Sequence, residues 1–406
     1  MGYTFIKGSV TVPKGFKASG IHCGIRKNKT KRDLALIFCE KKCTAAAVYT
    51  TNLVKSSPIT VTKKNLEDGY AQAVICNSGN ANTCNADGIE KAELMCSLAA
   101  KELGISAGDI IVGSTGVIGQ ILPIEPIRDG MAQLAAELSE TGSANAAEAI
   151  MTTDTVPKEV AVETVIAGKT VRIGGISKGS GMIHPNMATM LCFVTTDAAI
   201  SADMIRKAVK TAADKTFNMI SIDGDTSTND TLSVMASGLA GNPEITEENE
   251  DYAAFLEALT AVCRGLSRMM AKDGEGATKL LTCIVKGAKT EKDAKGVAKS
   301  VICSSLLKAA MFGADANWGR VLCAIGYSGC DVDVDKVDVA FASSAGKIEV
   351  CRNGAGIEFS EETAKTILIE DEIEILVDLN DGEGEAEAFG CDLTYEYVKI
   401  NGDYRT

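Results

Sequence analysis

The segment Lys178-Gly-Ser-Gly-Met-Ile-His-Pro-Asn-Met-Ala-Thr-Met-Leu191 decides how the rest of this sequence is interpreted. It places a threonine, Thr189, directly after a small residue, Ala188, near the middle of the chain. A threonine hydroxyl becomes a good nucleophile when the peptide bond before it is cut, because the freed α-amine then accepts the hydroxyl proton. The reference pKa of an α-amine, about 7.7–8.0, suits a general base near neutral pH. The segment therefore predicts self-cleavage between Ala188 and Thr189, followed by acyl transfer at the new N-terminus.

Residues that restrict the backbone surround this candidate nucleophile. Gly179, Gly181 and Pro185 can hold the peptide bond in a strained geometry that favours attack on the Ala188 carbonyl. The Ala-Thr pair alone does not distinguish a nucleophile from an ordinary buried strand residue. His184, five residues before Thr189, is an alternative base, although a packed or solvated loop histidine is the simpler interpretation and the α-amine needs no imidazole.

A glycine-rich turn, Gly113-Ser-Thr-Gly-Val-Ile-Gly119, follows directly after an apolar strand pattern at 110–112. It can present backbone N–H groups and the Thr115 hydroxyl to a developing oxyanion, which acyl transfer requires. A phosphate-binding loop and a purely structural turn are the alternatives. No G-x-x-x-x-G-K-[ST] pattern occurs in the chain, which disfavours the phosphate loop.

Charged residues elsewhere suit a zwitterionic substrate. Lys178 would face a carboxylate, Glu275 an ammonium group, and the terminal Asn401-Gly-Asp-Tyr-Arg-Thr406 would add further polar contacts. The alternative is that these are ordinary surface residues. The turn Asp223-Gly-Asp-Thr-Ser-Thr-Asn-Asp230 lacks EF-hand spacing, so hydrogen-bonded turn structure is preferred over a cation site. Trp318 is expected in a core or interface, with a substrate wall as the alternative.

Composition narrows the class of protein. The chain has 406 residues, 46% apolar content and a formal net charge of −13, which disfavours nucleic acid and anionic membranes as partners. No apolar run reaches the roughly 18 residues of a membrane span, and no secretory signal is evident. The fourteen cysteines are scattered and the chain has only two histidines, so no metal site is expected. We expect reduced, buried cysteines and a cytoplasmic enzyme.

Hydrophobic periodicity indicates an α/β (α+β) layered sandwich of sheets and helices. Strands are expected at 34–39, 73–76, 110–112, 190–195, 219–222, 337–341, 347–351, 372–378 and 391–400. Helices are expected at 89–103, 127–138, 144–151, 201–215, 252–272 and 294–312, with Ser201 as an N-cap. The stretches 243–251 and 381–387 are expected to be solvated connections.

Several motifs together resemble the ornithine acetyltransferase family of arginine biosynthesis, also called glutamate N-acetyltransferase. The resemblance runs almost from end to end. It rests on Ala47-Val-Tyr-Thr-Thr-Asn52, Asn77-Ser-Gly-Asn-Ala-Asn82, Ser114-Thr-Gly-Val-Ile-Gly119, Met151-Thr-Thr-Asp154, the 178–191 and 223–230 segments quoted above, Gly274-Glu-Gly-Ala277, Asn317-Trp-Gly-Arg320 and Tyr404-Arg-Thr406. Two departures are His184, where alanine is frequent, and Ala316, where proline often precedes Asn-Trp-Gly-Arg.

The resemblance implies roles for particular residues. Thr189 matches the family's nucleophile, and Thr115 and Gly116 match its oxyanion-hole pair. The positions that match its substrate contacts are Thr152, Lys178, Thr189, Glu275, Asn401 and Thr406. Cleavage would leave an α chain, residues 1–188, and a β chain, residues 189–406, with two of each in the working heterotetramer. The implied fold is shared with self-processing aminopeptidases.

The implied reaction is ping-pong transfer of an acetyl group from N2-acetyl-L-ornithine to L-glutamate through an acetyl-Thr189 ester. No cofactor is expected, although acetyl-CoA is a possible second donor, which would make the enzyme bifunctional. An N-terminal-nucleophile amidohydrolase or aminopeptidase is the rival enzyme class, because it shares the self-cutting step but passes the acyl group to water. A non-enzymatic interaction protein would not explain why these motifs occur together.

Overall fold

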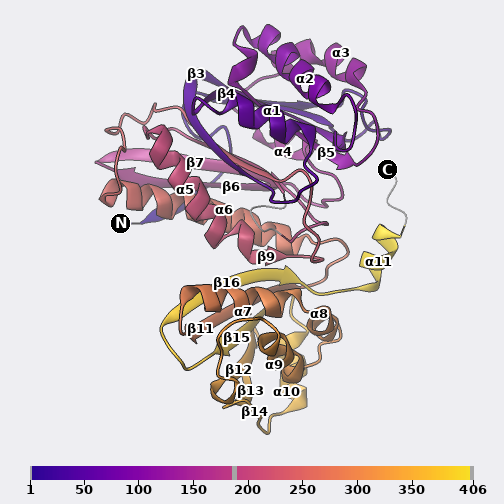
Figure 1. The fold of residues 1–406 in the computed structure, drawn as a ribbon, viewed down its shortest axis with the longest axis vertical. Helices are drawn as coiled ribbons and strands as arrows, with labels where there is room; N and C mark the ends of the chain where they lie inside the picture. Colours follow the sequence, from indigo (N-terminus) through magenta and orange to yellow (C-terminus); the bar gives the residue numbers. More distant parts are fainter. Residues whose placement is uncertain (1, 185–189, 403–406) are drawn as a thin grey trace.

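Two β-sheets stacked along the long axis organise the molecule in the computed structural model, which describes residues 2–184 and 190–402 (Figure 1). The larger sheet has nine strands, in the order β1-β6-β7-β8-β10-β3-β4-β5, with β2 paired to β3. These strands are β1 (Tyr3–Ile6), β2 (Phe16–Ile21), β3 (Leu34–Tyr49), β4 (Tyr70–Asn80), β5 (Ile110–Val117), β6 (Lys158–Ile166), β7 (Lys169–Lys178), β8 (Leu191–Thr196) and β10 (Thr231–Ala236).

The long strand β3 folds this sheet into two layers. Its first part, 34–39, pairs with β2 and β4, and its last part, 44–49, pairs with β10. The pairing with β4 shifts register between Phe38 and Cys43, where a bulge bends the strand. Alternate residues of β8 show the layering, because Phe193 enters the core between the two layers whereas Val194 enters the core on the outer side.

Helices complete the layers around the larger sheet. The outer face of β2–β5 is covered by α1 (Ser57–Asn65), α2 (Gly88–Leu103) and α3 (Ile124–Ala136). The outer face of β6–β8 and β10 is covered by α5 (Ala202–Lys215) and α6 (Glu250–Lys272), and α4 (Ser143–Ala149) lies in the inner core (Figure 1). The expected layered α/β sandwich is therefore confirmed.

The smaller sheet has seven strands in the order β14-β13-β12-β15-β11-β16-β9. They are β9 (Ile220–Ser221), β11 (Leu280–Ala288), β12 (Asp338–Ser343), β13 (Gly346–Arg352), β14 (Ala355–Gly356), β15 (Glu372–Asp378) and β16 (Gly384–Cys391). Its core is closed by α7 (Glu291–Cys303), α8 (Ser305–Phe312), α9 (Trp318–Gly326) and α10 (Glu361–Leu368). Phe389 and Cys391 of β16 pack into the core of α5 and α6, which joins the two bodies.

Three expectations about the second half were wrong. The single helix expected at 294–312 is two helices, because Ser304 ends α7 and accepts a hydrogen bond from the Leu307 N–H as the N-cap of α8. The strand expected at 391–400 ends at Cys391, and the chain continues as the helix α11 (Tyr395–Asn401). The connection expected at 381–387 ends earlier than predicted, because β16 begins at Gly384.

Other expectations were confirmed. The Ser201 side chain accepts a hydrogen bond from the Met204 N–H and caps α5. Trp318 packs against the core of the smaller sheet, next to Gly356. All fourteen cysteines are free thiols, and nine of them are buried. Across 2–184 and 190–402, no helix combines the length and apolar character needed to cross a membrane.

The connection between β7 and β8 determines what a cut in the 185–189 segment would do. Lys178, the last residue of β7, pairs with Leu191, the first residue of β8. Strands β8 and β10 come from the second half of the chain, yet they lie between β7 and β3, which come from the first half. The two halves therefore share one continuous set of strand pairings.

We predict that the two chains produced by a cut at Ala188–Thr189 remain together under native conditions. Separating them would expose the paired edges of β7, β8, β10 and β3 and the cores on both sides. The cut protein should elute from a size-exclusion column as one species of at least 42.5 kDa and should separate only in denaturant. Separate elution of the two chains in native buffer would contradict this topology.

Candidate active site

All of the predicted site residues that the structure describes line one cavity of about 110 Å³. They are Thr115, Gly116, Thr152, Lys178, Glu275 and Asn401. Ala188, Thr189 and Thr406 lie outside the described residues. A smaller adjoining cavity of about 20 Å³ shares Thr115 and Lys178 and is also lined by Met190, the residue that follows Thr189 in the chain. Residues far apart in sequence are thus brought to one place.

The predicted oxyanion loop is the end of β5. Gly116 has φ +131°, in the region that favours glycine. A Cβ atom there would lie 2.3 Å from the Gly79 carbonyl carbon and 2.5 Å from the Asn80 nitrogen. Only glycine lets β5 approach β4 this closely. The preceding residue, Thr115, is buried and lines the cavity. The close approach of β5 to β4 therefore fixes the backbone at 115–116, whose N–H groups are the expected donors to the oxyanion.

A second residue, Asn229, holds this loop and was not predicted as a site residue. Its Nδ2 donates to the carbonyl oxygens of Ser114 and Ala81, each at 2.7 Å. Its Oδ1 accepts from the Thr83 hydroxyl at 2.9 Å. Asn229 therefore joins the turn before β10 to the end of β5. In the sequence, only its position in the 223–230 motif pointed to a role for Asn229 near the site.

Lys178 ends β7 and is buried in the same cavity. Burial lowers the pKa of its ammonium group, and the carboxylates of Asp154 and Glu275 oppose that shift. A substrate carboxylate entering the cavity would add another negative charge next to the ammonium group. The site is thus arranged to stabilise Lys178 as a cation when an anionic group binds.

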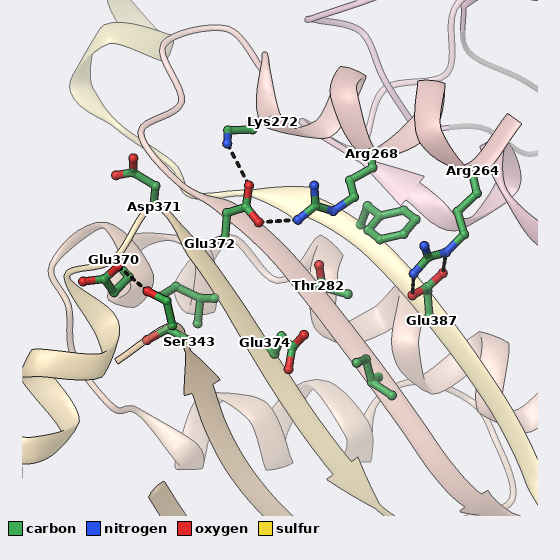
Figure 2. Close-up of a pocket in the computed structure, with 14 residues that line it drawn as sticks. Arg264, Arg268, Lys272, Thr282, Ser343, Glu370, Asp371, Glu372, Glu374 and Glu387 are labelled. Atoms are coloured by element: carbon green, nitrogen blue, oxygen red, sulfur yellow. Dashed lines mark hydrogen bonds and ion pairs between the residues drawn. The ribbon is translucent and has the colours of Figure 1, made fainter. Parts of the chain in front are cut away.

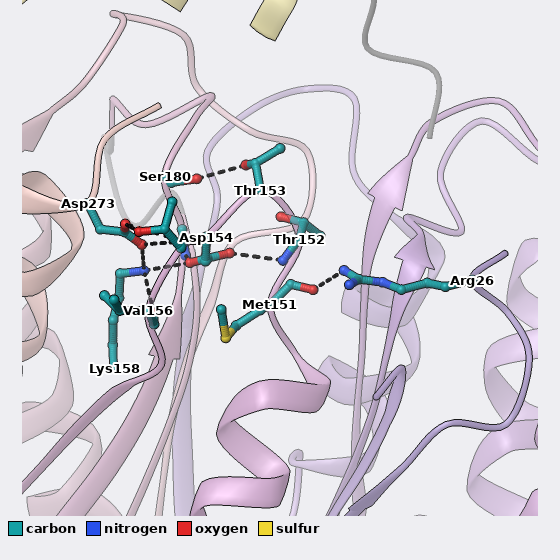
Figure 3. A network of polar contacts seen from close by, with 11 residues as sticks. Arg26, Met151, Thr152, Thr153, Asp154, Val156, Lys158, Ser180 and Asp273 are labelled. Carbon is teal, nitrogen blue, oxygen red and sulfur yellow. Dashed lines mark hydrogen bonds and ion pairs between the residues drawn. The ribbon is translucent and has the colours of Figure 1, made fainter. Parts of the chain in front are cut away.

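A buried ion triad lies behind the cavity wall (Figure 3). The Lys158 side chain is 0% exposed, and its Nζ lies 2.7 Å from Asp154 Oδ1 and 2.6 Å from Asp273 Oδ2. Asp154 belongs to the Met151-Thr-Thr-Asp154 motif, but nothing in the sequence indicated its pairing with a lysine on β6 or with an aspartate after α6. The triad joins the 154–158 segment to Asp273, the residue that follows α6.

Asp154 also shapes the backbone on both sides of the cavity. Its carboxylate accepts a hydrogen bond from the Thr152 N–H at 2.9 Å (Figure 3). It also accepts one from the Gly179 N–H at 2.7 Å. Burial acts to raise the pKa of this carboxyl, but the ammonium groups of Lys158 and Lys178 outweigh it and hold the pKa well below its usual range. Asp154 is therefore a carboxylate that positions the Thr152 loop and the start of the glycine-rich segment.

Glu275 and Asn401 meet on the other side of the cavity. Asn401 Nδ2 donates to Glu275 Oε2 at 2.7 Å, and the Glu275 backbone N–H donates to the Ser180 carbonyl at 2.8 Å. A Cβ atom on Gly181 would lie 2.3 Å from the Glu275 carboxyl carbon. The absence of a side chain at Gly181 lets the carboxylate face the cavity, and helix α11 brings Asn401 to it.

The Asp223 turn is hydrogen-bonded to the glycine-rich segment that begins at Lys178. The Asp223 carboxylate accepts from the backbone N–H groups of Met182 at 2.6 Å and Ile183 at 2.9 Å. It also accepts from the Asp225 N–H at 3.2 Å. These bonds make it the hydrogen-bonded turn that the sequence favoured, and they fix the backbone just before His184.

His184 packs against the smaller body. Its Nδ1 lies 3.1 Å from Ser221 Oγ and 3.4 Å from Cys303 Sγ. Burial and the nearby charge of Lys299 lower its pKa to about 4, against a weaker opposing effect of Asp223. The imidazole is therefore neutral near pH 7 and occupied by contacts with two neighbours, as a packed loop histidine is.

A larger cavity, about 640 Å³, lies elsewhere, between α6 and the smaller sheet (Figure 2). Arg264 pairs with Glu387 through two of its guanidinium nitrogens, and Arg268 and Lys272 pair with Glu372. The three basic side chains of this cavity are thus each paired with a carboxylate. None of the predicted site residues lines it.

We predict that Asp154→Asn lowers the free energy of unfolding by about 3–5 kcal/mol at pH 7, because it removes one of the carboxylates that offset the buried ammonium groups of Lys158 and Lys178. Urea denaturation of the variant and the parent protein would measure the loss. Asp129→Asn, an exposed aspartate on α3, is the matched control and should change stability little.

The loss should also depend on pH in one direction. Because the folded-state pKa of Asp154 is lowered, its contribution is complete above the unfolded value of about 3.9 and is lost as pH falls through the folded pKa. The stability difference between parent and Asp154→Asn should therefore be constant from pH 8 to about 5 and shrink below about 4. A difference that grows on acidification would contradict this assignment.

We predict that His184→Gln leaves self-cleavage intact, since the imidazole is held in contact with Ser221 and Cys303 and packs as a loop histidine. Intact mass under denaturing conditions should show the same two fragments as the parent protein. Ser221→Ala removes one contact while keeping the imidazole, so it separates a packing effect from proton transfer. A folded but uncut His184→Gln protein, with Ser221→Ala cut normally, would make the imidazole the base.

Known proteins resemble this chain over nearly its whole length. A sequence profile of the ArgJ family matches residues 17–406. The arginine biosynthesis bifunctional protein ArgJ of Caldanaerobacter subterraneus subsp. tengcongensis is 50% identical over 402 residues, 99% of each chain. That of Symbiobacterium thermophilum is 52% identical over 404 residues, 99% of this chain and 100% of the relative.

A solved structure agrees with these relatives. The crystal structure of the arginine biosynthesis bifunctional protein from Bacillus halodurans is 48% identical with a TM-score of 0.50. The match covers 52% of this chain and 97% of that chain, so the crystallised chain is about half as long as this one. From the profile and the relatives, this chain belongs to the ArgJ family.

Proposed function

We propose that this chain transfers the acetyl group of N2-acetyl-L-ornithine to L-glutamate in arginine biosynthesis, through an acetyl ester on Thr189. The observation that carries the proposal is the cavity that gathers Thr115, Gly116 and Lys178, together with the adjoining space lined by Met190. A donor loop, a buried cation and the residue next to the candidate nucleophile meet at one point, as acyl transfer to an amino acid requires.

Self-cleavage at Ala188–Thr189 would create the nucleophile. Attack of the Thr189 hydroxyl on the Ala188 carbonyl, followed by hydrolysis of the resulting ester, would free the α-amine that serves as base. The hydrogen bonds that Asp154 and Asp223 make to the preceding segment support a backbone held in one conformation. The Bacillus halodurans chain, about half the length of this one, is the size expected of a cleavage product.

The first half-reaction would remove ornithine. The Thr189 hydroxyl gives its proton to the α-amine and attacks the acetyl carbonyl, while donors at Thr115 and Gly116 hold the oxyanion. The acetyl C–N bond then breaks, the α-amine returns the proton to the leaving nitrogen, and an acetyl-threonine ester remains. Lys178 would bind the substrate carboxylate, and Glu275 with Asn401 would face the side-chain ammonium of ornithine.

The second half-reaction would use the same groups in reverse. The α-amine of glutamate attacks the ester carbonyl, a C–N bond forms, the threonine C–O bond breaks, and the hydroxyl regains its proton. Lys178 can bind the carboxylate of either amino acid, which explains how one small cavity serves both. The cavity of about 110 Å³ leaves little room for water beside a bound amino acid, which protects the ester from hydrolysis.

Thr152 would contact the substrate at the cavity wall, and Thr406 would do so from the end of the chain. From the family resemblance we also infer a cytoplasmic heterotetramer of two α chains (1–188) and two β chains (189–406). No metal takes part in this scheme. The bifunctional naming of the relatives is consistent with a second acetyl donor.

We predict that Thr189→Ala abolishes both self-cleavage and acetyl transfer, because it removes the hydroxyl that attacks the Ala188 carbonyl in cleavage and the acetyl carbonyl in transfer. Intact mass should show one chain of 406 residues for the variant and fragments of 188 and 218 residues for the parent, whose lengths add to the full chain. Thr189→Ser keeps a hydroxyl and should retain cleavage and measurable transfer. Transfer by the alanine variant would exclude the scheme.

The acceptor of the acetyl group distinguishes the proposed transferase from the amidohydrolase alternative. Labelled N-acetylornithine should lose its acetyl group rapidly only when glutamate is present, and the label should appear in N-acetylglutamate. Release of free acetate at the same rate without glutamate would identify a hydrolase instead.

A further inference from the structure

A buried carboxylate that the proposed reaction does not use, that of Asp230, lies beside the active site. Asp230 is 1% exposed and lines the small cavity of about 20 Å³ together with Thr115, Lys178 and Met190. It is the last residue of the 223–230 motif. Moving a carboxylate out of water is costly unless donor or cationic groups face it, so its burial at this point indicates that such a group belongs nearby.

The backbone at Asp230 is fixed from two sides. Strands β8 and β10 run parallel with Leu191 opposite Thr231, and the Thr231 N–H donates to the Met190 carbonyl at 2.8 Å. On the other side, the Asp230 carbonyl accepts from the N–H of Thr50, which follows β3, at 3.0 Å. Asp230 therefore lies next to Met190, at the start of the strand pair that follows the proposed cleavage site.

This placement brings the carboxylate close to the amine that cleavage would create. Thr189 directly precedes Met190, and consecutive Cα atoms are about 3.8 Å apart across a trans peptide. The freed α-amine would therefore form within one residue of the strand pairing at Asp230. The cavity that Met190 and Asp230 both line, about 20 Å³, has room for about one water-sized group, which is the size of an amine with its hydrogens.

The charges around this point define what a carboxylate would do there. They are Lys178 of β7, Asp154 and Lys158 behind it, Glu275 after α6, and Asp223 and Asp230 of the turn before β10. A cation as close as Lys178 lowers the pKa of a neighbouring amine, and Asp230 is the only acidic residue among the described residues that line this cavity. A carboxylate here would therefore counteract Lys178.

We propose that the Asp230 carboxylate accepts a hydrogen bond from the α-amine that cleavage frees on Thr189, and so orients that amine toward the threonine hydroxyl. The inference rests on the proposed acetyl transfer. In this scheme Asp230 touches neither the acetyl group nor the amino acid, so it is a positioning residue that acts through the amine. It takes up no proton in either half-reaction. By opposing the charge of Lys178, it also keeps the amine basic enough to accept the hydroxyl proton near neutral pH.

The experiment follows acetylation of the processed enzyme by N-acetylornithine in a single turnover without glutamate. Intact mass of quenched samples distinguishes acetylated from free β chains between about pH 5 and 9, and the maximal rate and half-saturating substrate concentration are fitted at each pH. The variants are Asp230→Asn and Asp230→Glu. The matched control is Asp225→Asn, which changes an exposed aspartate of the same turn that is not among the described lining residues of the cavity.

We expect Asp230→Asn to cut itself normally, because the amine exists only after cleavage. Its maximal acetylation rate should fall about tenfold or more, while the half-saturating concentration of N-acetylornithine stays within about twofold of the parent value. The acid limb of its rate profile should move to lower pH by about 0.5–1 unit, because the amine loses an anionic neighbour and becomes less basic. Asp230→Glu should recover part of the rate and the acid limb of the parent, and Asp225→Asn should match the parent in both.

Three results would overturn the inference. One is a folded Asp230→Asn protein that stays uncut, which would place the action of the carboxylate before the amine exists. Another is an acid limb that does not move, whether or not the rate falls, which would make Asp230 a structural residue. The third is loss of folding in both Asp230 variants while Asp225→Asn folds. Failure of the parent enzyme to form an acetyl ester from N-acetylornithine would instead refute the proposed function itself.

Discussion

The buried ammonium group of Lys158 is the constraint on which the site depends. Removing this charge from water is costly, and the two carboxylates of Asp154 and Asp273 offset that cost only while both stay within hydrogen-bond distance. Each carboxylate also holds backbone, Asp154 at Thr152 and Gly179, and Asp273 at Thr155. A well-packed apolar replacement of such a triad can equal it in stability, but it would release the loops that form the cavity walls.

Strand pairing places a similar constraint on the position of a cut in the chain. An enzyme that cuts itself near the middle of its sequence must keep both parts in place, and this fold does so by placing β8 and β10 between β7 and β3. The cores on both faces of β8 contain residues from both halves. The new N-terminus would therefore form within an already assembled structure, so that cleavage changes the chemistry at one bond and leaves the packing intact.

Much of this arrangement could be predicted from the sequence, and the remainder has a physical reason for being missed. Lys178, Glu275 and the Thr115 turn were singled out by residue type, but their roles came from the family resemblance and not from any local pattern. The roles of Asn229 and Lys158 depend on partners far along the chain, at Ser114 and Asp273, and no local pattern reports such pairs.

Errors in the elements have similar causes. Apolar periodicity continues across Ser304, so the break between α7 and α8 is visible only as a side-chain cap. The bend of β3 arises from a register shift against β4, which a single-strand pattern does not contain. Two neighbouring cavities also differ in charge. Charged residues of both signs line the cavity of about 110 Å³, as a zwitterion requires, whereas only basic ones line the cavity of about 510 Å³. Gly116 and Thr152 border both cavities, so the end of β5 and the loop after α4 shape the two spaces together.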